Sequence, residues 1–237
     1  MLDLLIRDAR ARGVSLSEAQ IGQFERYLAL LTAWSERLNL VGNPDPAIIE
    51  RRHFAESLAL GAALRERQLL RGREDVLDVG AGAGFPGVPI RIAWPGLRLT
   101  LAEETAKKTA FLSALVAELR LDDVAVLTGR AETLAHDAAL RERFDLVLAR
   151  AVAPLSVLLE LTLPFARLGG HVAAPKGSRA DEEVAASSRA LAALGGEVHS
   201  VPLEVAGPPQ TLVVIVKRRS TPDAYPRRPG LPKKAPL

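Results

Sequence analysis

The 237-residue chain contains no cysteine, and this absence removes several classes of chemistry at once. It excludes disulfide bonds, thiolate metal sites and any mechanism that needs a cysteine nucleophile. The chain also lacks an uninterrupted apolar stretch long enough to cross a bilayer. Acids and arginines interrupt the opening segment, MLDLLIRDARARG, unlike a secretory signal peptide. We therefore expect a cytoplasmic protein with no membrane partner and no bound metal.

Positive charge is concentrated at the carboxyl-terminal end of the sequence. Residues 217–237 contain seven Lys and Arg side chains and one acid, Asp223, whereas the preceding residues carry a slight excess of acids. A basic, proline-rich composition favours an extended arm that reaches a polyanion over a packed element. A solvated terminus has the same composition, so both interpretations stay open.

Hydrophobic periodicity divides the chain into three expected regions. They are a helical cap, an α/β domain and a basic tail, at residues 1–70, 71–218 and 219–237. The stretch LSEAQIGQFERYLALLTAWSERLNL places apolar residues at helical spacing. Ser17 is the expected N-cap of this helix, and Gln20 completes a capping box. The prolines of NPDP end the helix, and a second helix is expected from Pro46 to about Leu64.

Short β-rich runs alternate with helical segments from Glu74 onward, which is typical of a doubly wound α/β sheet. The seven expected strands lie at residues 76–80, 98–103, 124–130, 144–150, 171–177, 197–204 and 211–218. Helices are expected between them at residues 86–93, 105–119, 132–140, 154–167 and 180–194. The linker AGPPQ is too short for a crossover helix, so the last two strands should be antiparallel neighbours. The sequence therefore predicts a Rossmann-like, mostly parallel sheet with an antiparallel last strand.

A glycine-rich turn follows the first expected strand in the stretch DVGAGAGFPG, residues 78–87. Glycines let a ligand approach the backbone, and the N-terminus of the following helix favours an anion. The part GAGFPG fits the dinucleotide pattern G-x-G-x-x-G, whereas GAGAG fits a turn that holds S-adenosylmethionine through Gly80, Gly82 and Gly84. Asp78 favours the second pattern, because a carboxylate before the turn suits a cationic amino-acid group better than a pyrophosphate.

Acidic residues after the next strands extend the candidate cofactor site. Glu103 ends the second strand, where a carboxylate meets a ribose in a doubly wound sheet. Glu104 follows it, and a solvated helix cap describes this residue equally well. After the third strand, Ala131 and Glu132 are expected near an adenine. An ordinary acid at a helix N-terminus is the alternative for Glu132.

Arg150 and Lys176 lie at the carboxyl ends of the fourth and fifth expected strands, at the edge where this architecture binds ligands. Arg150 joins the cofactor-binding candidates, and its alternative role is an ion pair with Asp78, Glu103 or Glu132. Lys176 could meet a phosphate or a developing charge, and a surface lysine is its alternative. No residue is assigned with certainty to catalysis, so both remain positioning candidates.

The substrate chemistry is narrowed by two missing features. Methyl transfer to an exocyclic amine usually uses an Asn/Asp-Pro-Pro-aromatic turn after the fourth strand, and this chain has ARAVAP there. Methylation of a pyrimidine carbon needs a cysteine, which is absent. A ring nitrogen such as guanine N7 carries an in-plane lone pair, so alignment with the methyl group is sufficient and no general base is expected.

Eight short motifs are distributed along nearly the whole chain: WSERLNL, RHFAES, DVGAGAGFPG, KKTAFL, ARAVAPL, PKG, TLVVI and YPRRPGLPKKAPL. With them the chain resembles the bacterial small-subunit ribosomal RNA methyltransferase G family, also called glucose-inhibited division protein B. The resemblance implies a class I S-adenosylmethionine-dependent fold and methylation of guanine N7 in 16S rRNA. It implies cofactor contacts at Gly80, Phe85, Glu103, Ala131, Glu132 and Arg150. It implies RNA contacts at Arg52, His53, Lys176, Arg227 and Arg228.

The chain departs from the family pattern at several positions. It has Glu56 and Glu103 where aspartate is usual, and Gln210 near a usual arginine, which puts a substrate contact there in doubt. The alternatives are an NAD-dependent oxidoreductase and a non-catalytic RNA-binding factor of ribosome assembly. We expect a monomer whose partner is 16S rRNA or the small ribosomal subunit. Deleting residues 219–237 should then weaken RNA binding and leave cofactor affinity unchanged.

Overall fold

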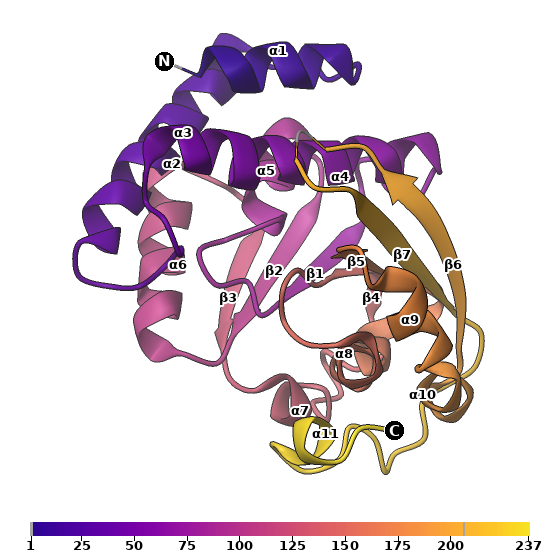
Figure 1. Cartoon of the computed structure of the whole chain (residues 1–237). Coiled ribbons are helices and arrows are strands. Elements are labelled where there is room, and N and C mark those ends of the chain that lie inside the picture. The colour runs from indigo at the N-terminus through magenta and orange to yellow at the C-terminus, as the bar shows by residue number, and fades with distance from the viewer. Residues whose placement is uncertain (1, 206) are drawn as a thin grey trace.

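The computed structural model describes residues 2–205 and 207–237, which form a seven-stranded sheet covered by helices on both faces (Figure 1). The strand order is β3-β2-β1-β4-β5-β7-β6. The strands are β1 (Asp75–Val79), β2 (Arg98–Glu103), β3 (Val124–Thr128), β4 (Phe144–Leu148), β5 (Ala166–Lys176), β6 (Gly196–Leu203) and β7 (Gln210–Lys217). β7 is antiparallel to both β5 and β6, whereas β1 to β5 pair in parallel. The expected Rossmann-like sheet with an antiparallel last strand is confirmed.

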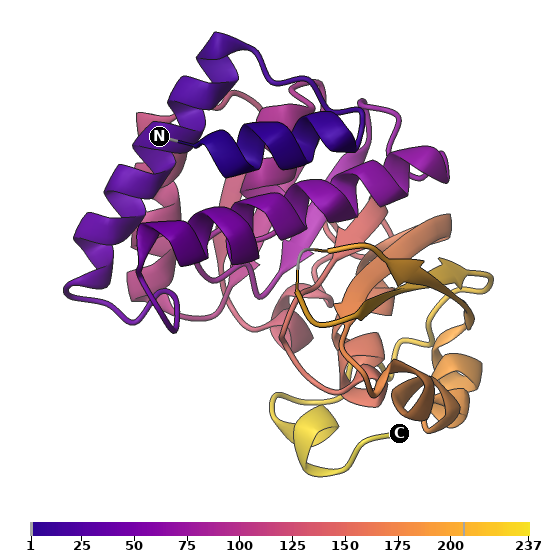
Figure 2. The ribbon, with the colours of Figure 1, turned by 45° about the horizontal axis from the view of Figure 1, so that its top comes forward.

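Alternate residues of each strand face opposite helix layers, as the pleat requires. In β1, Val76 packs into one core, whereas Leu77 and Val79 pack into the other, so Asp78 faces the same side as Val76. The first layer contains α1 (Asp3–Ala11), α2 (Glu18–Ser35), α4 (Glu56–Glu66), α5 (Gly87–Ala93) and α6 (Ala106–Glu118) (Figure 2). The second layer contains α7 (Ala131–Leu134), α8 (Leu155–Thr162), α9 (Ala180–Ala185) and α10 (Ser188–Leu194).

The second expected N-terminal helix contains a change of helical geometry. It is divided into α3 (Pro46–Ile48), a π-helical segment (Ile49–Ala55) and α4. Arg52 and His53 lie in the π-helical segment. Wider helical turns of this kind are rare and often mark functional sites.

Local sequence signals set other helix bounds. Ser17 and Gln20 form the expected capping box at the start of α2. The expected helix 154–167 gives way to a 3-10 turn, Leu163–Phe165, and β5 begins directly after it. The expected helix 180–194 is divided between α9 and α10.

The N-terminal helices and the α/β region share one apolar core. Phe54 of the π-helical segment packs on Phe85 of the glycine-rich turn with ring centroids 5.8 Å apart, and Trp34 of α2 packs edge to face on Phe111 of α6 at 5.6 Å. A boundary at residue 70 therefore stays a prediction. Within the described part of the chain, no helix has both the length and the apolar character of a membrane span.

The expectation of an extended C-terminal arm is wrong, because residues 219–237 pack against the second helix layer. Arg141 donates to the backbone oxygens of Thr221 and Tyr225 at 2.8 and 2.9 Å. The segment ends with α11 (Leu231–Lys234), which lies beside α7 and α8 (Figure 1). Two of its prolines are buried, Pro226 and Pro232.

Candidate active site

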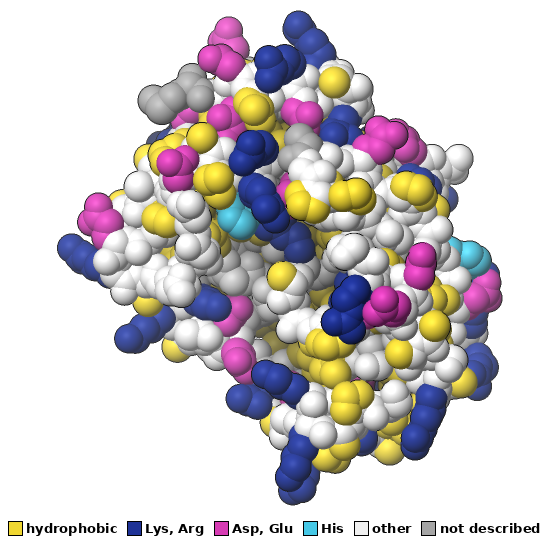
Figure 3. Space-filling view, viewed as in Figure 1, with side chains coloured by type: hydrophobic (Ala, Val, Ile, Leu, Met, Phe, Trp, Pro, Cys, Tyr) yellow, Lys and Arg dark blue, Asp and Glu magenta, His cyan; other side chains and the backbone are white. Residues whose placement is uncertain are grey.

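Two cavities lie at the carboxyl edge of the sheet and share Arg150 and Ala151. Cavity A, of about 380 Å³, lies at the ends of β1, β2, β3 and β4. Cavity B, of about 590 Å³, lies between the π-helical segment, the end of β5 and the start of β7. Figure 3 shows this face hollowed near its centre, with Lys and Arg side chains around the hollow. Ligands bind at this edge in doubly wound sheets.

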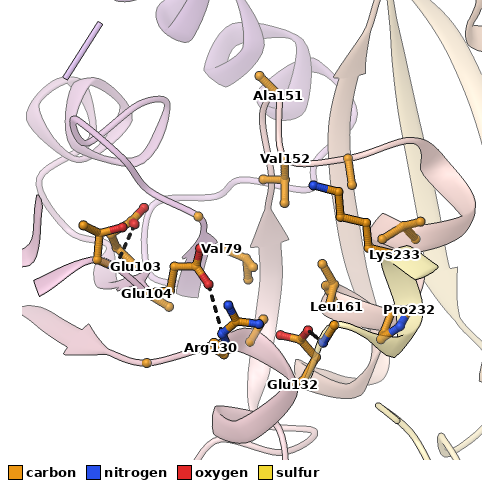
Figure 4. A pocket seen from close by; sticks show the side chains of 18 of the residues that line it. Val79, Glu103, Glu104, Arg130, Glu132, Ala151, Val152, Leu161, Pro232 and Lys233 are labelled. Atoms are coloured by element: carbon orange, nitrogen blue, oxygen red, sulfur yellow. Dashed lines mark hydrogen bonds and ion pairs between the residues drawn. The ribbon is translucent and has the colours of Figure 1, made fainter. Parts of the chain in front are cut away.

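Cavity A contains six of the ten residues expected at the cofactor. They are Gly80, Glu103, Glu104, Ala131, Glu132 and Arg150. Figure 4 labels the three acids, Glu103, Glu104 and Glu132. The other four do not line it: Asp78, Gly82, Gly84 and Phe85. The structure therefore separates residues that face the cavity from residues that shape the turn behind it.

Two glycines of the turn are required by the packing around them. Gly80 and Gly84 have φ values of +71° and +94°, which favour glycine. A Cβ on Gly80 would lie 2.9 Å from Val152 Cγ2, and one on Gly84 would lie 2.6 Å from Tyr27 Oη. Gly84 is thus constrained by α2 beneath the turn, whereas Gly80 is constrained by a residue that also lines cavity A.

Glu103 connects the turn to the end of β2. Its Oε2 accepts a hydrogen bond from Gly82 N at 3.1 Å, and its Oε1 accepts one from Thr105 N at 3.0 Å. Each carboxylate oxygen can accept a further hydrogen bond. Glu103 can therefore hold the turn and still offer acceptors to cavity A.

Asp78 lies behind the turn and does not line cavity A, contrary to the expectation. The pleat of β1 points it toward the first helix layer, where it is 0% exposed. Its Oδ2 accepts a hydrogen bond from Gly87 N, at the start of α5, at 2.8 Å. Burial raises the pKa of Asp78 to about 7, against the lowering effects of this hydrogen bond and of Arg150.

Phe85 belongs to a stack of three rings beneath the two cavities. Its centroid lies 5.3 Å from that of Tyr27 and 4.8 Å from that of His53, with nearly parallel ring planes. The Arg150 guanidinium lies 5.6 Å from the Phe85 ring centroid. Phe85 thus supports two side chains that face cavity B.

Arg150 joins the two cavities and fixes the hydrogen-bonding state of His53. Its Nη2 donates to His53 Nδ1 at 2.6 Å, and its Nη1 donates to the Arg52 backbone oxygen at 3.3 Å. Because arginine only donates, Nδ1 must accept and the proton of the neutral ring lies on Nε2. The ion pair of Arg150 is with Glu56, at 3.8 Å, and not with Asp78, Glu103 or Glu132.

The His53 ring is expected to be neutral at pH 7. Burial first, then Arg150 and Arg52, lowers its pKa to about 4. The folded state therefore disfavours protonation, and stability from neutral His53 is lost as the pH falls from about 6.5 through 4. An NMR titration of the His53 ring, assigned by its absence in His53→Gln, should have its midpoint near 4. A midpoint near 6.5 would contradict this environment.

Cavity B brings together three of the five expected RNA contacts, Arg52, His53 and Lys176. Lys176 Nζ donates to Ala153 O at 2.7 Å and lies 2.9 Å from Glu183 Oε2. Gln210 also lines the cavity, and its Nε2 donates to Glu56 Oε2 at 3.3 Å. The first residue of β7 is thereby connected to the start of α4.

The sequence matches the family model described as rRNA small subunit methyltransferase G over residues 20–213. The chain belongs to this family. It is 46% identical over 238 residues to the Ribosomal RNA small subunit methyltransferase G of Roseiflexus castenholzii, with 100% of both chains covered. The Bacillus velezensis protein of the same name is 40% identical over 239 residues, covering 100% of this chain and 98% of its own.

Solved structures share the fold of this rRNA methyltransferase family member at low sequence identity. Cofactor-bound Rv0187 from MTB has a TM-score of 0.57 and 18% identity, covering 84% of this chain and 91% of its own. Precorrin-6y C5,15-methyltransferase from Geobacter metallireducens GS-15 has a TM-score of 0.50 and 13% identity, covering 76% and 91%. These similarities show a Rossmann-like methyltransferase fold. Family membership makes the chain an S-adenosylmethionine-dependent methyltransferase of small-subunit rRNA.

The residues of cavity A fit S-adenosylmethionine better than a dinucleotide. Its volume is within the range of roughly 300–1,000 Å³ of ligand pockets. The Asp78 carboxylate already binds the Gly87 N–H at the start of α5, which is where a dinucleotide fold receives a pyrophosphate. That N–H is therefore not available to a pyrophosphate, so the geometry disfavours the nicotinamide alternative.

The remaining expected RNA contacts, Arg227 and Arg228, lie outside both cavities. Arg227 forms an ion pair with the buried Glu160 at 2.7 Å, whereas Arg228 is exposed. Sequence reasoning missed the tail residues that line cavity A, Gly230, Pro232 and Lys233. The motif PRRPGLPKKAPL was the signal that could have identified them. Its basic, proline-rich composition instead led to the prediction of an RNA-binding arm.

Proposed function

We propose that the chain methylates N7 of a guanine in 16S rRNA, with S-adenosylmethionine in cavity A and the guanine in cavity B. The observation that supports this assignment is that Arg150 and Ala151 line both cavities. Two reactants held on either side of this segment would meet at short range, and such positioning supplies much of the rate in a transfer that needs no general base. When bound, S-adenosylmethionine supplies a methyl group that leaves sulfur and bonds to N7, which releases S-adenosylhomocysteine.

In cavity A we assign separate roles to the residues after each strand. Glu103 offers acceptors for ribose hydroxyl groups, and the backbone at Ala131 and Glu132 borders the adenine. Gly80 leaves room for the ligand beside the turn. Glu104 is the weakest member of this set, because it is 57% exposed and pairs with Arg130 at 3.3 Å.

In cavity B we assign His53 to the guanine base, and Arg52 and Lys176 to the RNA phosphates. The neutral His53 ring has an N–H at Nε2, which suits guanine O6, the acceptor next to N7. Arg52 is half exposed, and Lys176 lines the same cavity with a side chain that is 10% exposed; both cations suit phosphate.

We propose that the protein acts as a cytoplasmic monomer on 16S rRNA or the small subunit. Among the described residues, the large hydrophobic side chain that is exposed is Leu168, at 53%. A single such residue does not form the apolar patch of a stable dimer. Light scattering after gel filtration should give the monomer mass, and a dimer mass would contradict this part of the proposal.

The activity is tested with small subunits from cells that lack the gene, incubated with the protein and S-adenosylmethionine labelled in its methyl group. Label should enter 16S rRNA, and reverse transcription after borohydride and aniline treatment should stop at one guanine. Glu103→Ala should lose most labelling, whereas Glu118→Ala, an exposed acid on α6, should not. Binding of both ligands without transfer would favour an assembly factor, and tight NADH binding without S-adenosylhomocysteine binding would favour an oxidoreductase.

A further inference from the structure

The C-terminal tail contributes directly to the wall of cavity A. Gly230, Pro232 and Lys233 line it, opposite residues that follow β1 and β2. Figure 4 shows the Lys233 side chain extending from α11 toward Val152, with Pro232 beside Leu161 of α8. The cavity therefore has a side that is separate in sequence from the strand ends.

A buried ion pair holds this wall in place. Glu160 of α8 is 0% exposed, and its carboxylate accepts hydrogen bonds from Arg227 N, Nε and Nη2 at 2.7–2.8 Å. Arg227 Nη2 also donates to Ala235 O at 2.9 Å, beyond the end of α11. Arg227 thus fixes the tail on both sides of the residues that line the cavity.

The tail also contacts a residue assigned to the adenine. Gly230 N donates to Glu132 Oε1 at 2.9 Å, at the start of α7. Gly230 has a φ of +81°, so the turn that directs its N–H to Glu132 favours glycine. A shift of the tail would therefore change the surroundings of Ala131 and Glu132.

The composition of this side of cavity A suits a purine. Pro232 is buried and presents an apolar ring, and Val157 and Leu161 of α8 add aliphatic surface beside it. Lys233 is exposed at the margin, so its ammonium group stays in contact with solvent. Pockets for flat ligands combine apolar walls with a few polar groups of this kind.

We propose that residues 221–237 form the adenosine wall of the cofactor site, so that cofactor binding and closure of this segment stabilise each other. The inference rests on the proposed assignment of cavity A to S-adenosylmethionine. A ligand that contacts only the closed segment must shift the segment toward that state, and the closed segment must raise ligand affinity by the same factor. The tail then acts in cofactor binding, and the sequence-based expectation that its deletion spares cofactor affinity is reversed.

Calorimetric titration with S-adenosylhomocysteine tests this inference without any methyl transfer. Deletion of residues 229–237 should raise Kd at least about tenfold, and Pro232→Gly should raise it about fivefold through lost apolar contact. Lys234→Ala, in the same short helix but outside cavity A, should leave Kd within about twofold of the full chain. Circular dichroism identifies a deletion variant that fails to fold, and Pro232→Gly then decides the outcome.

Trypsin provides a second readout on the unmodified full chain. Cleavage after Lys233 and Lys234 requires α11 to open, so saturating S-adenosylhomocysteine should slow it at least about tenfold, as followed by mass spectrometry. A full chain that binds no S-adenosylhomocysteine would overturn the proposed function. A full chain that binds it, with unchanged Kd in folded variants and unchanged cleavage, would overturn only the adenosine wall.

Discussion

Replacing Arg150 by alanine is expected to lower kcat/KM for methyl transfer by about 10²–10³-fold. Arg150 donates to His53 Nδ1 and to the Arg52 backbone, and it lines both cavities. Its removal leaves His53 without the donor that fixes its tautomer and leaves Arg52 as the remaining ion-pair partner of Glu56. The measurement is single-turnover labelling of small subunits at saturating S-adenosylmethionine.

Two further variants identify which property of Arg150 matters. Arg150→Lys keeps the charge but lacks the planar fork that reaches His53 and Arg52 together, so most of the loss should persist. Arg73→Ala, an exposed arginine before β1, should retain full activity. A kcat/KM of Arg150→Ala within tenfold of the unchanged protein would show that Arg150 does not position the reactants.

Arg227→Ala is expected to lower the free energy of unfolding by about 3 kcal/mol. Glu160 is completely buried, and loss of the guanidinium leaves its carboxylate with one main-chain donor, Arg227 N. Urea denaturation followed by circular dichroism measures the change. Arg228→Ala, the exposed neighbour, should change it by less than about 0.5 kcal/mol.

A double variant separates the ion pair from general disruption of the tail. Glu160→Gln combined with Arg227→Ala removes the buried charge together with its partner, so part of the lost stability should return. The outcome that would contradict this role of Arg227 is a loss below about 1 kcal/mol in the single variant.

The sequence predicts the seven strands and the antiparallel last strand well, because both follow from local hydrophobic patterns and linker lengths. The AGPPQ linker is too short for a crossover, which is why β7 is antiparallel to β6. The π-helical segment has no such signal, because its apolar spacing resembles that of an α-helix. The folded tail was not predicted, because the composition of residues 219–237 says nothing about the surface on which they pack. Glu160 in the apolar helix α8 needs a cation as its partner, and the tail supplies Arg227.

The sequence predicts the site residues that lie at the ends of strands. It predicts less well on which face of the sheet a residue within a strand lies. Glu103 and Arg150 line the cavities because Glu103 ends β2 and Arg150 comes just after β4, both at the carboxyl edge of the sheet. Asp78 lies one position before Val79, which lines cavity A, so the alternation along β1 turns Asp78 away. The stack of Phe85 on Tyr27 and His53 joins distant segments, and residue spacing alone does not show it.

The residues that line cavity A are spread widely along the sequence, and this spread determines when the site can form during folding. Its walls come from residues as far apart in sequence as Gly80 and Lys233. Contacts between distant residues close late, because the long intervening loop must lose its conformational freedom first. A nascent chain that still lacks its last residues can therefore assemble the sheet, but it has an open cavity A. With the tail as the proposed adenosine wall, full affinity for the cofactor is reached only when synthesis of the polypeptide is almost finished.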